Sequence, residues 1–380
     1  MSHHERDDIL FKVMKIKVLP LISSVFRVCL SLVAQASFGF SGHRLKIIGV
    51  TGTTGKTVTA HYIASILEKS GCKVGVVSRA NIRINNETVA NTEDVTATPF
   101  RLHRQLLNMR KQGMDWVVLE VASDCLKDKR IWGVPIRVAV MTNLSSAHLT
   151  SEETVEEYAA TKAQLLSMAQ KAVVLNRDDE WYEYFLRTPK QAVYDYGASE
   201  DAAVRIDRHK FKSEVSHVRF RYGERVVNVT LGLPGETMAY CALAAATTAY
   251  GLDVAWQHVR GGLESVKSVP GRVEVIRQEQ PFGIMIDYAQ TPGAFAKTLQ
   301  DMESVTDKKL IAVLSRSQPA PYMEVAQGLS DTVLEKDVDS SSLEEVFDMA
   351  DSGDRIVILG DTFWRESHIS EEVNRLLGSV

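Results

Sequence analysis

The segment GVTGTTGKT at positions 49–57 constrains the fold more than any other stretch of this chain. A β-branched run, LKIIGV (45–50), precedes it, and an amphipathic helical pattern over 56–70 follows. A strand, a glycine-rich turn and a helix in this order predict a phosphate-binding loop, whose backbone N–H groups and helix dipole attract negative charge. The spacing departs from the usual loop pattern, because Val50 stands where its first glycine is expected.

The residues expected to bind a nucleotide here are Gly52, Thr53, Thr54, Gly55, Lys56 and Thr57. The two glycines let the backbone approach phosphate oxygens without a Cβ clash. Lys56 is expected to reach the β- and γ-phosphates, and the Thr57 hydroxyl to bind Mg²⁺. The loop therefore predicts ATP and Mg²⁺. An unrelated phosphate-loop kinase or GTPase is the weaker interpretation, because no NKxD segment for reading a base is found.

Beyond the loop, short apolar runs alternate with amphipathic helical stretches. The runs lie at 45–50, 73–78, 115–121, 137–143 and 172–176, and the helical stretches include 56–70, 100–112 and 154–168. This alternation predicts an α/β fold with a parallel sheet covered by helices on both faces. Between about 190 and 232 apolar and polar residues alternate, which predicts an antiparallel region at the sheet edge.

The turn-forming residues VPGR (269–272) suggest a domain boundary, and a second strand–helix alternation follows them. The prediction is a phosphate-loop, parallel-sheet central domain with a smaller Rossmann-like α/β domain at the C-terminus. The expected division is an N-terminal amphipathic helical segment at 1–44, the central ATP-binding domain at 45–270 and the short C-terminal domain at 271–380.

Composition narrows the classes of function. The chain has 380 residues, of which 45% are hydrophobic, enough for more than one core. The net charge of -4 argues against nucleic acid as a partner. Four cysteines without a CxxC pair suggest neither a disulfide framework nor a zinc site, so a cytoplasmic location is expected.

Residues 9–36 are apolar with scattered cations, but Pro20 and Arg27 interrupt the stretch. No uncharged run long enough for a membrane crossing remains. Apolar residues recur at helical spacing, at Leu21, Ile22, Val25, Phe26, Cys29, Leu30 and Val33. Two interpretations stay open: a helix that packs on the next domain, and an interfacial helix that makes peripheral contact with a membrane.

The motifs in their order resemble the Mur ligase family, and among its branches the UDP-N-acetylmuramoyl-tripeptide synthetases. They are TGTTGKT (51–57), LEVASDCL (119–126), MTNLSSAHL (141–149), YAATKAQLL (158–166), VLNRDDE (174–180), GRVEVI (271–276) and DYAQTP (287–292). The resemblance covers about 44–315. It implies an ATP-dependent ligase of peptidoglycan precursor synthesis that joins an amino acid to a carboxylate through an acyl phosphate.

The resemblance also implies roles for particular residues. Glu120, His148 and Lys162 would join Thr57 as metal ligands, with Lys162 carbamylated, and Lys56, Lys162 and His148 would be catalytic. Arg272 and Asp287 would contact the nucleotide from the C-terminal domain. Without the resemblance only Glu120 stands out, because strand ends beside a phosphate loop are where α/β proteins bind ligands. Without the resemblance, His148 would be interpreted as a structural histidine and Lys162 as an exposed helix lysine. Arg272 and Asp287 would each be interpreted as a member of an ordinary interdomain ion pair.

Several family features are missing. Met238 and Cys241 replace two asparagines, the second of which helps to hold adenine in the family, and Gln290 replaces a histidine. Ala147 stands for an acidic neighbour of His148. The N-terminal UDP-sugar domain and the Asp-Asn-Pro-Arg segment for the incoming amino acid are not found.

Two hypotheses follow. The first is a ligase whose partners are a UDP-muramoyl peptide, or a similar acceptor, and a free amino acid. The second is a degenerate Mur-type protein that binds nucleotide without ligating. Loss of the adenine and amino-acid motifs motivates the second, whereas retention of the loop and metal residues favours the first. The amino acid added and the oligomeric state are not predicted.

Overall fold

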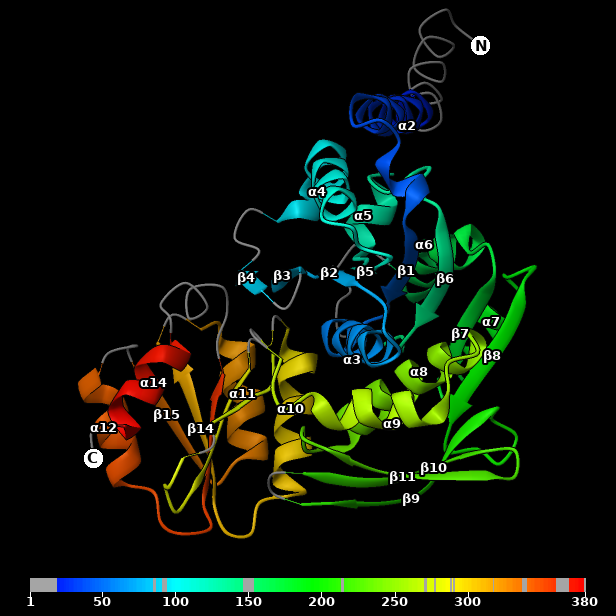
Figure 1. Ribbon diagram of the computed structural model, residues 1–380. Helices are drawn as coiled ribbons and strands as arrows, with labels where there is room; N and C mark the ends of the chain where they lie inside the picture. Colours follow the sequence, from blue (N-terminus) through cyan, green and yellow to red (C-terminus); the bar gives the residue numbers. More distant parts are fainter. Residues whose placement is uncertain are drawn as a thin grey trace, which may run out of the picture.

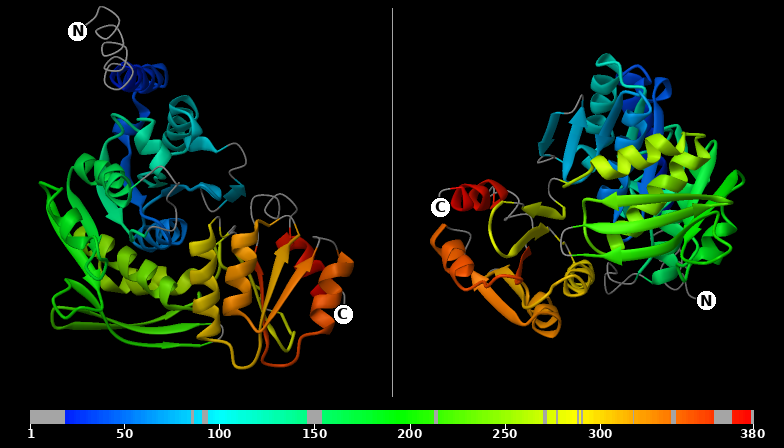
Figure 2. Two further views of the ribbon diagram at one scale, coloured as in Figure 1. Left: turned by 180° about the vertical axis from the view of Figure 1, so that it is seen from behind. Right: turned by 60° about the horizontal axis from the view of Figure 1, so that its bottom comes forward.

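The computed structural model describes residues 19–378 other than 85–86, 91–93, 146–153, 213–214, 270–271, 277, 288, 290, 317, 337–339 and 360–368. The chain forms two α/β units, one on an eleven-stranded sheet and one on a five-stranded sheet (Figure 1). Figure 2 shows the two units side by side in views from other directions. This arrangement agrees with the predicted fold class.

The large sheet has the strand order β11-β10-β9-β8-β7-β6-β1-β5-β2-β3-β4. Its strands are β1 (Lys46–Thr51), β2 (Val74–Val77), β3 (Asn81–Ile84), β4 (Glu87–Ala90), β5 (Trp116–Glu120), β6 (Ile136–Met141), β7 (Ala172–Asn176), β8 (Ala192–Gly197), β9 (Val204–Phe211), β10 (Ser216–Tyr222) and β11 (Arg225–Leu231). From β2 to β9 the neighbouring strands are parallel. The carboxyl ends of β1 and β5 therefore lie next to each other.

Helices cover both faces of this sheet because the central strands are apolar on both sides. Ile48 and Val50 of β1 belong to one core cluster, together with helices α3 (Lys56–Lys69), α8 (Glu236–Gly251) and α9 (Trp256–Ser265). Ile47 points into the opposite cluster. That cluster contains α4 (Pro99–Lys111), α5 (Ser123–Lys127), α6 (Val155–Met168) and α7 (Tyr182–Leu186).

The sheet edges differ in part from the sequence prediction. The antiparallel region near 190–232 is present as β9, β10 and β11. However, β8 pairs in parallel with both β7 and β9, so its assignment to the antiparallel region was wrong. At the other edge, β3 and β4 form an antiparallel hairpin that was not predicted, because each strand has only four residues and only half of them are apolar.

The smaller sheet has the order β12-β13-β16-β14-β15. Its elements are β12 (Glu274–Ile276), β13 (Gly283–Asp287), α10 (Pro292–Glu303), β14 (Leu310–Ser315), α11 (Ala320–Leu329), β15 (Thr332–Lys336), α12 (Ser340–Asp348), β16 (Arg355–Leu359) and α14 (Ile369–Leu377). Only β12 is antiparallel to its neighbour. Strand β15 was not predicted, because its residues, TVLEK, form no continuous apolar run. Most of its side chains are half-buried. The borders 44/45 and 270/271 stay predictions.

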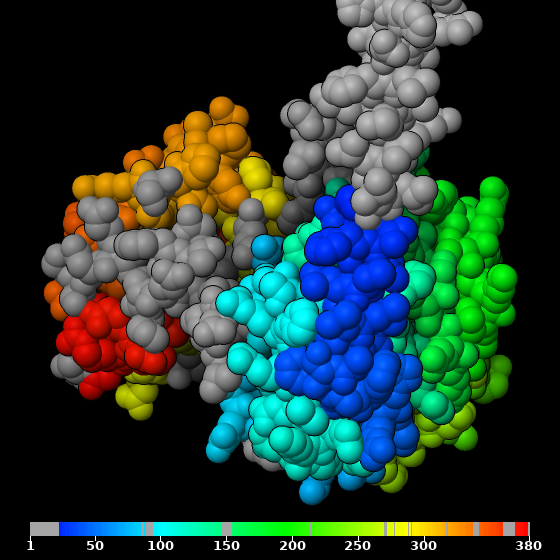
Figure 3. Space-filling view, turned by 90° about the horizontal axis from the view of Figure 1, so that it is seen from above, coloured from blue at the N-terminus to red at the C-terminus, as the bar shows by residue number. Residues whose placement is uncertain are grey.

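At the other end of the chain, α2 (Leu19–Ser37) lies on the outside of the large unit beside α4. Figure 3 shows α2 in dark blue across the face that is seen from above. None of the described helices combines the length and the hydrophobicity that a membrane crossing requires.

Candidate active site

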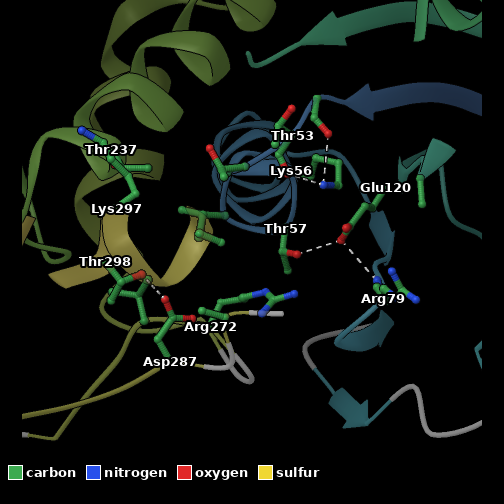
Figure 4. Close-up of a pocket in the computed structure, with 18 of the residues that line it drawn as sticks. Thr53, Lys56, Thr57, Arg79, Glu120, Thr237, Arg272, Asp287, Lys297 and Thr298 are labelled. Atoms are coloured by element: carbon green, nitrogen blue, oxygen red, sulfur yellow. Dashed lines mark hydrogen bonds between the residues drawn. The ribbon is translucent and has the colours of Figure 1, made fainter. Parts of the chain in front are cut away.

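A cavity of about 470 Å³ lies between the two units, at the carboxyl ends of β1 and β5 (Figure 4). All the predicted site residues that the structure describes line it: Gly52, Thr53, Thr54, Gly55, Lys56, Thr57, Glu120, Lys162, Arg272 and Asp287. They come from five separate segments of the chain. His148 and Gln290 lie outside the described residues. The roles of these side chains stay predictions, but their meeting in one cavity is a structural fact.

The phosphate loop requires both of its glycines. Gly52 has φ +144°, and a Cβ there would lie 1.8 Å from the Thr142 hydroxyl oxygen. Gly55 has φ +79°, and a Cβ there would lie 2.7 Å from the Cys241 sulfur. Thr142 also donates to the Thr54 carbonyl at 2.7 Å, which fixes the loop from the end of β6. An alanine at either glycine would therefore distort the loop.

Lys56 folds back across the loop. Its Nζ donates to the carbonyls of Gly52 at 3.1 Å and Thr53 at 2.9 Å. Burial lowers the pKa of Lys56, and the nearby Glu120 carboxylate opposes this effect. Arg272 lies close enough to lower that pKa further. The cavity thus concentrates positive charge where loop N–H groups already attract an anion.

Thr57, at the start of α3, and Glu120, at the end of β5, lie in direct contact. The Thr57 hydroxyl donates a hydrogen bond to Oε2 of Glu120 at 2.7 Å. The backbone N–H of Arg79 donates to the same oxygen at 3.2 Å. In the described part of the chain no three His, Cys, Asp or Glu side chains gather as a metal-binding group. A hydroxyl and a carboxylate still suit Mg²⁺, which takes few protein ligands and completes its shell with phosphates and water.

Lys162 of α6 is 1% exposed. Its Nζ donates to the Gly52 carbonyl at 2.8 Å and to the Ser123 hydroxyl at 3.2 Å. It also lies 4.3 Å from the centroid of the Tyr158 ring. The interpretation of Lys162 as an exposed helix lysine was therefore wrong: α6 packs against the phosphate loop and buries it. This position favours a role in the site.

The opposite wall carries Arg272 and Asp287 (Figure 4). Asp287, at the end of β13, accepts a hydrogen bond from the Thr298 hydroxyl at 2.7 Å through one carboxylate oxygen. Its other oxygen is buried and has no partner among the described residues. A buried acceptor without a partner is unfavourable unless a ligand supplies a donor. Asp287 therefore suits the hydroxyl groups of a ribose.

Sequence reasoning missed several cavity residues. Arg79, Ser123, Thr237, Lys297, Thr298 and Asp301 also line the cavity. Ser123 lies within the segment LEVASDCL (119–126) but was not singled out there, and the position of Lys297, Thr298 and Asp301 in the cavity depends on how the two units meet. Lys297, for example, lies 3.6 Å from Glu236 of α8, across the boundary between the units. No signal in the sequence could have paired them.

The two replaced asparagines have separate surroundings. Met238 lines the cavity, whereas Cys241 lines a neighbouring cavity of about 550 Å³. The Cys241 thiol donates to the Gly55 carbonyl at 3.5 Å. Burial raises the pKa of this thiol to about 12, so it is neutral. Cys241 thus packs beneath the phosphate loop, and the amide of the family pattern has no counterpart at that position.

Residues 50–249 match the model of the Mur ligase middle domain, and residues 271–362 match that of the Mur ligase glutamate ligase domain. The UDP-N-acetylmuramyl-tripeptide synthetase 2 of Oceanobacillus iheyensis is 34% identical over 289 residues, which cover 74% of this chain and 58% of the relative. The UDP-N-acetylmuramoyl-L-alanyl-D-glutamate–2,6-diaminopimelate ligase of Bacillus velezensis is 30% identical over 295 residues, which cover 75% of this chain and 60% of the relative.

The chain thus spans about three-fifths of the length of these two curated relatives. Among solved structures, a Mycobacterium tuberculosis folylpolyglutamate synthase complexed with ADP aligns with a TM-score of 0.73 at 17% identity, covering 97% of this chain and 98% of that one. This likeness shows a shared fold. The first family model alone covers more than half of the chain. The chain therefore belongs to the Mur ligase family.

Proposed function

We propose that this protein is an ATP-dependent ligase that joins the amino group of an amino acid to a carboxylate. The observation that carries the proposal is the cavity, in which the phosphate loop, Glu120 and the buried Lys162 face Arg272 and Asp287. Such a site can hold a nucleotide from both sides. It can also keep water away from a reactive acyl group.

The phosphate loop and Lys56 would bind the phosphates of ATP, with Asp287 on the ribose hydroxyls and Arg272 on the phosphates. Thr57 and Glu120 would hold Mg²⁺, which would supply charge stabilisation for the transferred phosphoryl group. The acceptor carboxylate attacks the γ-phosphorus, the bond to the bridging oxygen breaks, and ADP leaves. The amine then attacks the acyl carbon, and phosphate departs with the former carboxylate oxygen.

Lys162 is the second catalytic candidate. A carbamate forms when an unprotonated amine adds to CO₂ and releases one proton, and it converts a cation into an anion. With Glu120 nearby and His148 as the predicted third ligand, such a carbamate would help to hold a second cation that positions the acceptor. The buried position of Lys162 against the Gly52 carbonyl supports this role.

The names of the relatives suggest the substrates. Both curated relatives act on UDP-muramoyl peptides, so the proposed acceptor is such a peptide or a similar carboxylate, and the second substrate is a free amino acid. We place the protein in the cytoplasm, where ATP is available. Peripheral contact of residues 9–36 with a membrane is a separate proposal, because it depends on α2 and not on the cavity.

The test is phosphate release from ATP and Mg²⁺ with UDP-muramoyl peptides and a panel of amino acids. Wild type is compared with Lys162→Ala, Lys162→Glu and the control Lys190→Ala, which changes an exposed lysine. Release should require both an acceptor and an amine. Lys162→Ala should lower the rate by roughly 100-fold or more, and Lys162→Glu, which restores a carboxylate, should recover part of it. The control should match wild type.

The alternative is a Mur-type protein that binds nucleotide without ligating. The thiol of Cys241 in place of an adenine-binding amide is the observation that favours it. ATP binding without turnover under every condition, unchanged by Lys162→Ala, would establish this alternative and exclude the ligase.

A further inference from the structure

Helix α2 is amphipathic, but its polar side faces the protein and its apolar side faces outward. A helix on a protein surface normally turns its apolar side inward. In α2 the inward side carries polar side chains: Ser31 is fully buried and Gln35 is 2% exposed, next to the small, fully buried Ala34. The Ser31 hydroxyl donates to the Lys129 carbonyl at 2.6 Å, and the Gln35 amide donates to the Trp132 carbonyl at 2.7 Å. Arg27 adds an ion pair with Asp128 at 2.9 Å.

The outer face of α2 is apolar. It consists of Val25, Phe26, Cys29, Leu32 and Val33, which recur at one side of the helix and are all exposed. Phe26 is 66% exposed and Val25 is 56% exposed. Three fixed polar contacts hold the other side to the protein, so α2 cannot rotate to hide this face without losing them. The apolar face of α2 therefore stays on the outside of the protein.

Aromatic side chains extend the apolar surface beyond the helix. Phe100, at the start of α4, is exposed and lies 6.4 Å from the Phe38 ring. Trp132 is 45% exposed and belongs to the segment that accepts the α2 hydrogen bonds. Phe40, just past the end of α2, is 48% exposed. The five exposed apolar side chains on one side of α2 mark an interaction surface, whereas single exposed ones do not.

Charge identifies the occupant. From Ile9 to Leu45 the sequence has five Lys or Arg residues and no Asp or Glu, although the whole chain carries a net charge of -4. Lys12, Lys15 and Lys17 precede the described residues, and Arg27 and Arg44 lie within them. Two copies that met through this surface would bring like charges together. An anionic lipid surface offers both negative headgroups for the cations and an apolar layer for Phe26 and its neighbours. Because polar contacts hold α2 along the protein surface, it would lie in the plane of the membrane.

We propose that the outer face of α2 docks the protein on an anionic membrane surface. The inference is independent of the ligase proposal, because none of the residues in this face lines the cavity. For the described part of residues 9–36 the proposal combines the two interpretations: α2 packs on the large unit through its polar side and binds lipid through its apolar side.

The experiment is co-sedimentation of the full chain with vesicles of phosphatidylcholine alone, or of equal parts phosphatidylcholine and phosphatidylglycerol. Wild type should bind the anionic vesicles, bind the neutral ones far less, and be released by high salt. The variant Phe26→Ser/Val33→Ser should bind roughly tenfold or more weakly, since two exposed apolar side chains no longer enter the lipid. The control Val226→Ser/Met349→Ser changes exposed apolar residues elsewhere and should bind like wild type.

Nucleotide binding by each variant, measured in solution, checks that the variant is folded. No binding to either kind of vesicle, or equal binding by the Phe26→Ser/Val33→Ser variant, would overturn the proposal. Light scattering tests whether a second copy of the chain, and not a membrane, covers the outer face of α2. A dimer that this variant abolishes, without any vesicle binding by wild type, would show that a second copy covers the face and not a membrane.

Discussion

At the scale of single residues, the most specific prediction concerns Asp287. Its carboxylate is 6% exposed, and one oxygen is buried without a partner in the described structure. If that oxygen accepts a ribose hydroxyl, Asp287→Ala should weaken ADP binding by roughly 10- to 100-fold, the value of a hydrogen bond to a charged group. Isothermal titration calorimetry measures this affinity directly.

A matched variant separates this effect from a general loss of structure. Asp348→Ala removes an exposed carboxylate from α12 of the same unit and should leave ADP binding unchanged. Thermal unfolding of Asp287→Ala should occur no earlier than in wild type, because the variant removes a buried charge with an unsatisfied oxygen. Unchanged ADP affinity in Asp287→Ala would assign the residue a structural role beside Thr298.

The site residues differ in how far the sequence could reveal them. The phosphate loop follows from local spacing, and Glu120 from its place at a strand end. Lys162 could be found only through the family resemblance, because its helical pattern does not reveal that α6 packs its side chain against the Gly52 carbonyl. Thr298 carries no signal at all, since its role depends on the position of Asp287.

At the scale of elements, α4 carries an acid-sensitive histidine. His103 is 1% exposed, and neither ring nitrogen has a partner among the described residues. Burial lowers its pKa from 6.5 to about 4, with His43 adding to the effect. The folded state therefore holds fewer protons than the unfolded state between these values. Stability is complete above about pH 6.5 and falls as the pH drops toward 4.

At about pH 5 this histidine should cost roughly 2 kcal/mol of unfolding free energy relative to neutral pH. His103→Leu should remove that loss, as urea unfolding at the two pH values would show. His61, whose pKa burial also lowers to about 4, remains in the variant, so part of the acid loss should persist. The exposed His209→Leu is the control. Equal acid sensitivity in His103→Leu and wild type would contradict the assignment.

The long, strongly patterned elements were predictable. The helix expected at 56–70 is α3 at Lys56–Lys69, and that expected at 100–112 is α4 at Pro99–Lys111. Prediction failed at the edges of the sheets. The strands β3, β4 and β15 are short and mix apolar with polar residues, and strand pairing with the sheet determines their structure. Local periodicity does not contain that information.

At the scale of the whole molecule, the contact between the two units decides whether the cavity exists. Helix α8 begins at Glu236 without a side-chain cap of its own, because its cap position is Gly235. Asp301 of α10 supplies the cap from the other unit, accepting from the Thr237 N–H at 3.1 Å. Lys297 lies 3.7 Å from the same carboxylate. Any Cβ at Gly235 would lie 2.9 Å from Asp301, so glycine allows this approach.

Asp301→Ala should therefore loosen the two units without unfolding either one. The loss of one helix cap corresponds to about 1 kcal/mol, or roughly a fivefold shift from the closed toward an open arrangement. Small-angle X-ray scattering of the nucleotide-free protein should show a larger radius of gyration, and ATP should restore the compact form, because nucleotide contacts on both walls compensate for the missing cap. The exposed Asp307→Ala lies on the same unit and should scatter like wild type. Identical scattering of Asp301→Ala and wild type would mean that apolar packing between α8 and α10 holds the units together without the cap.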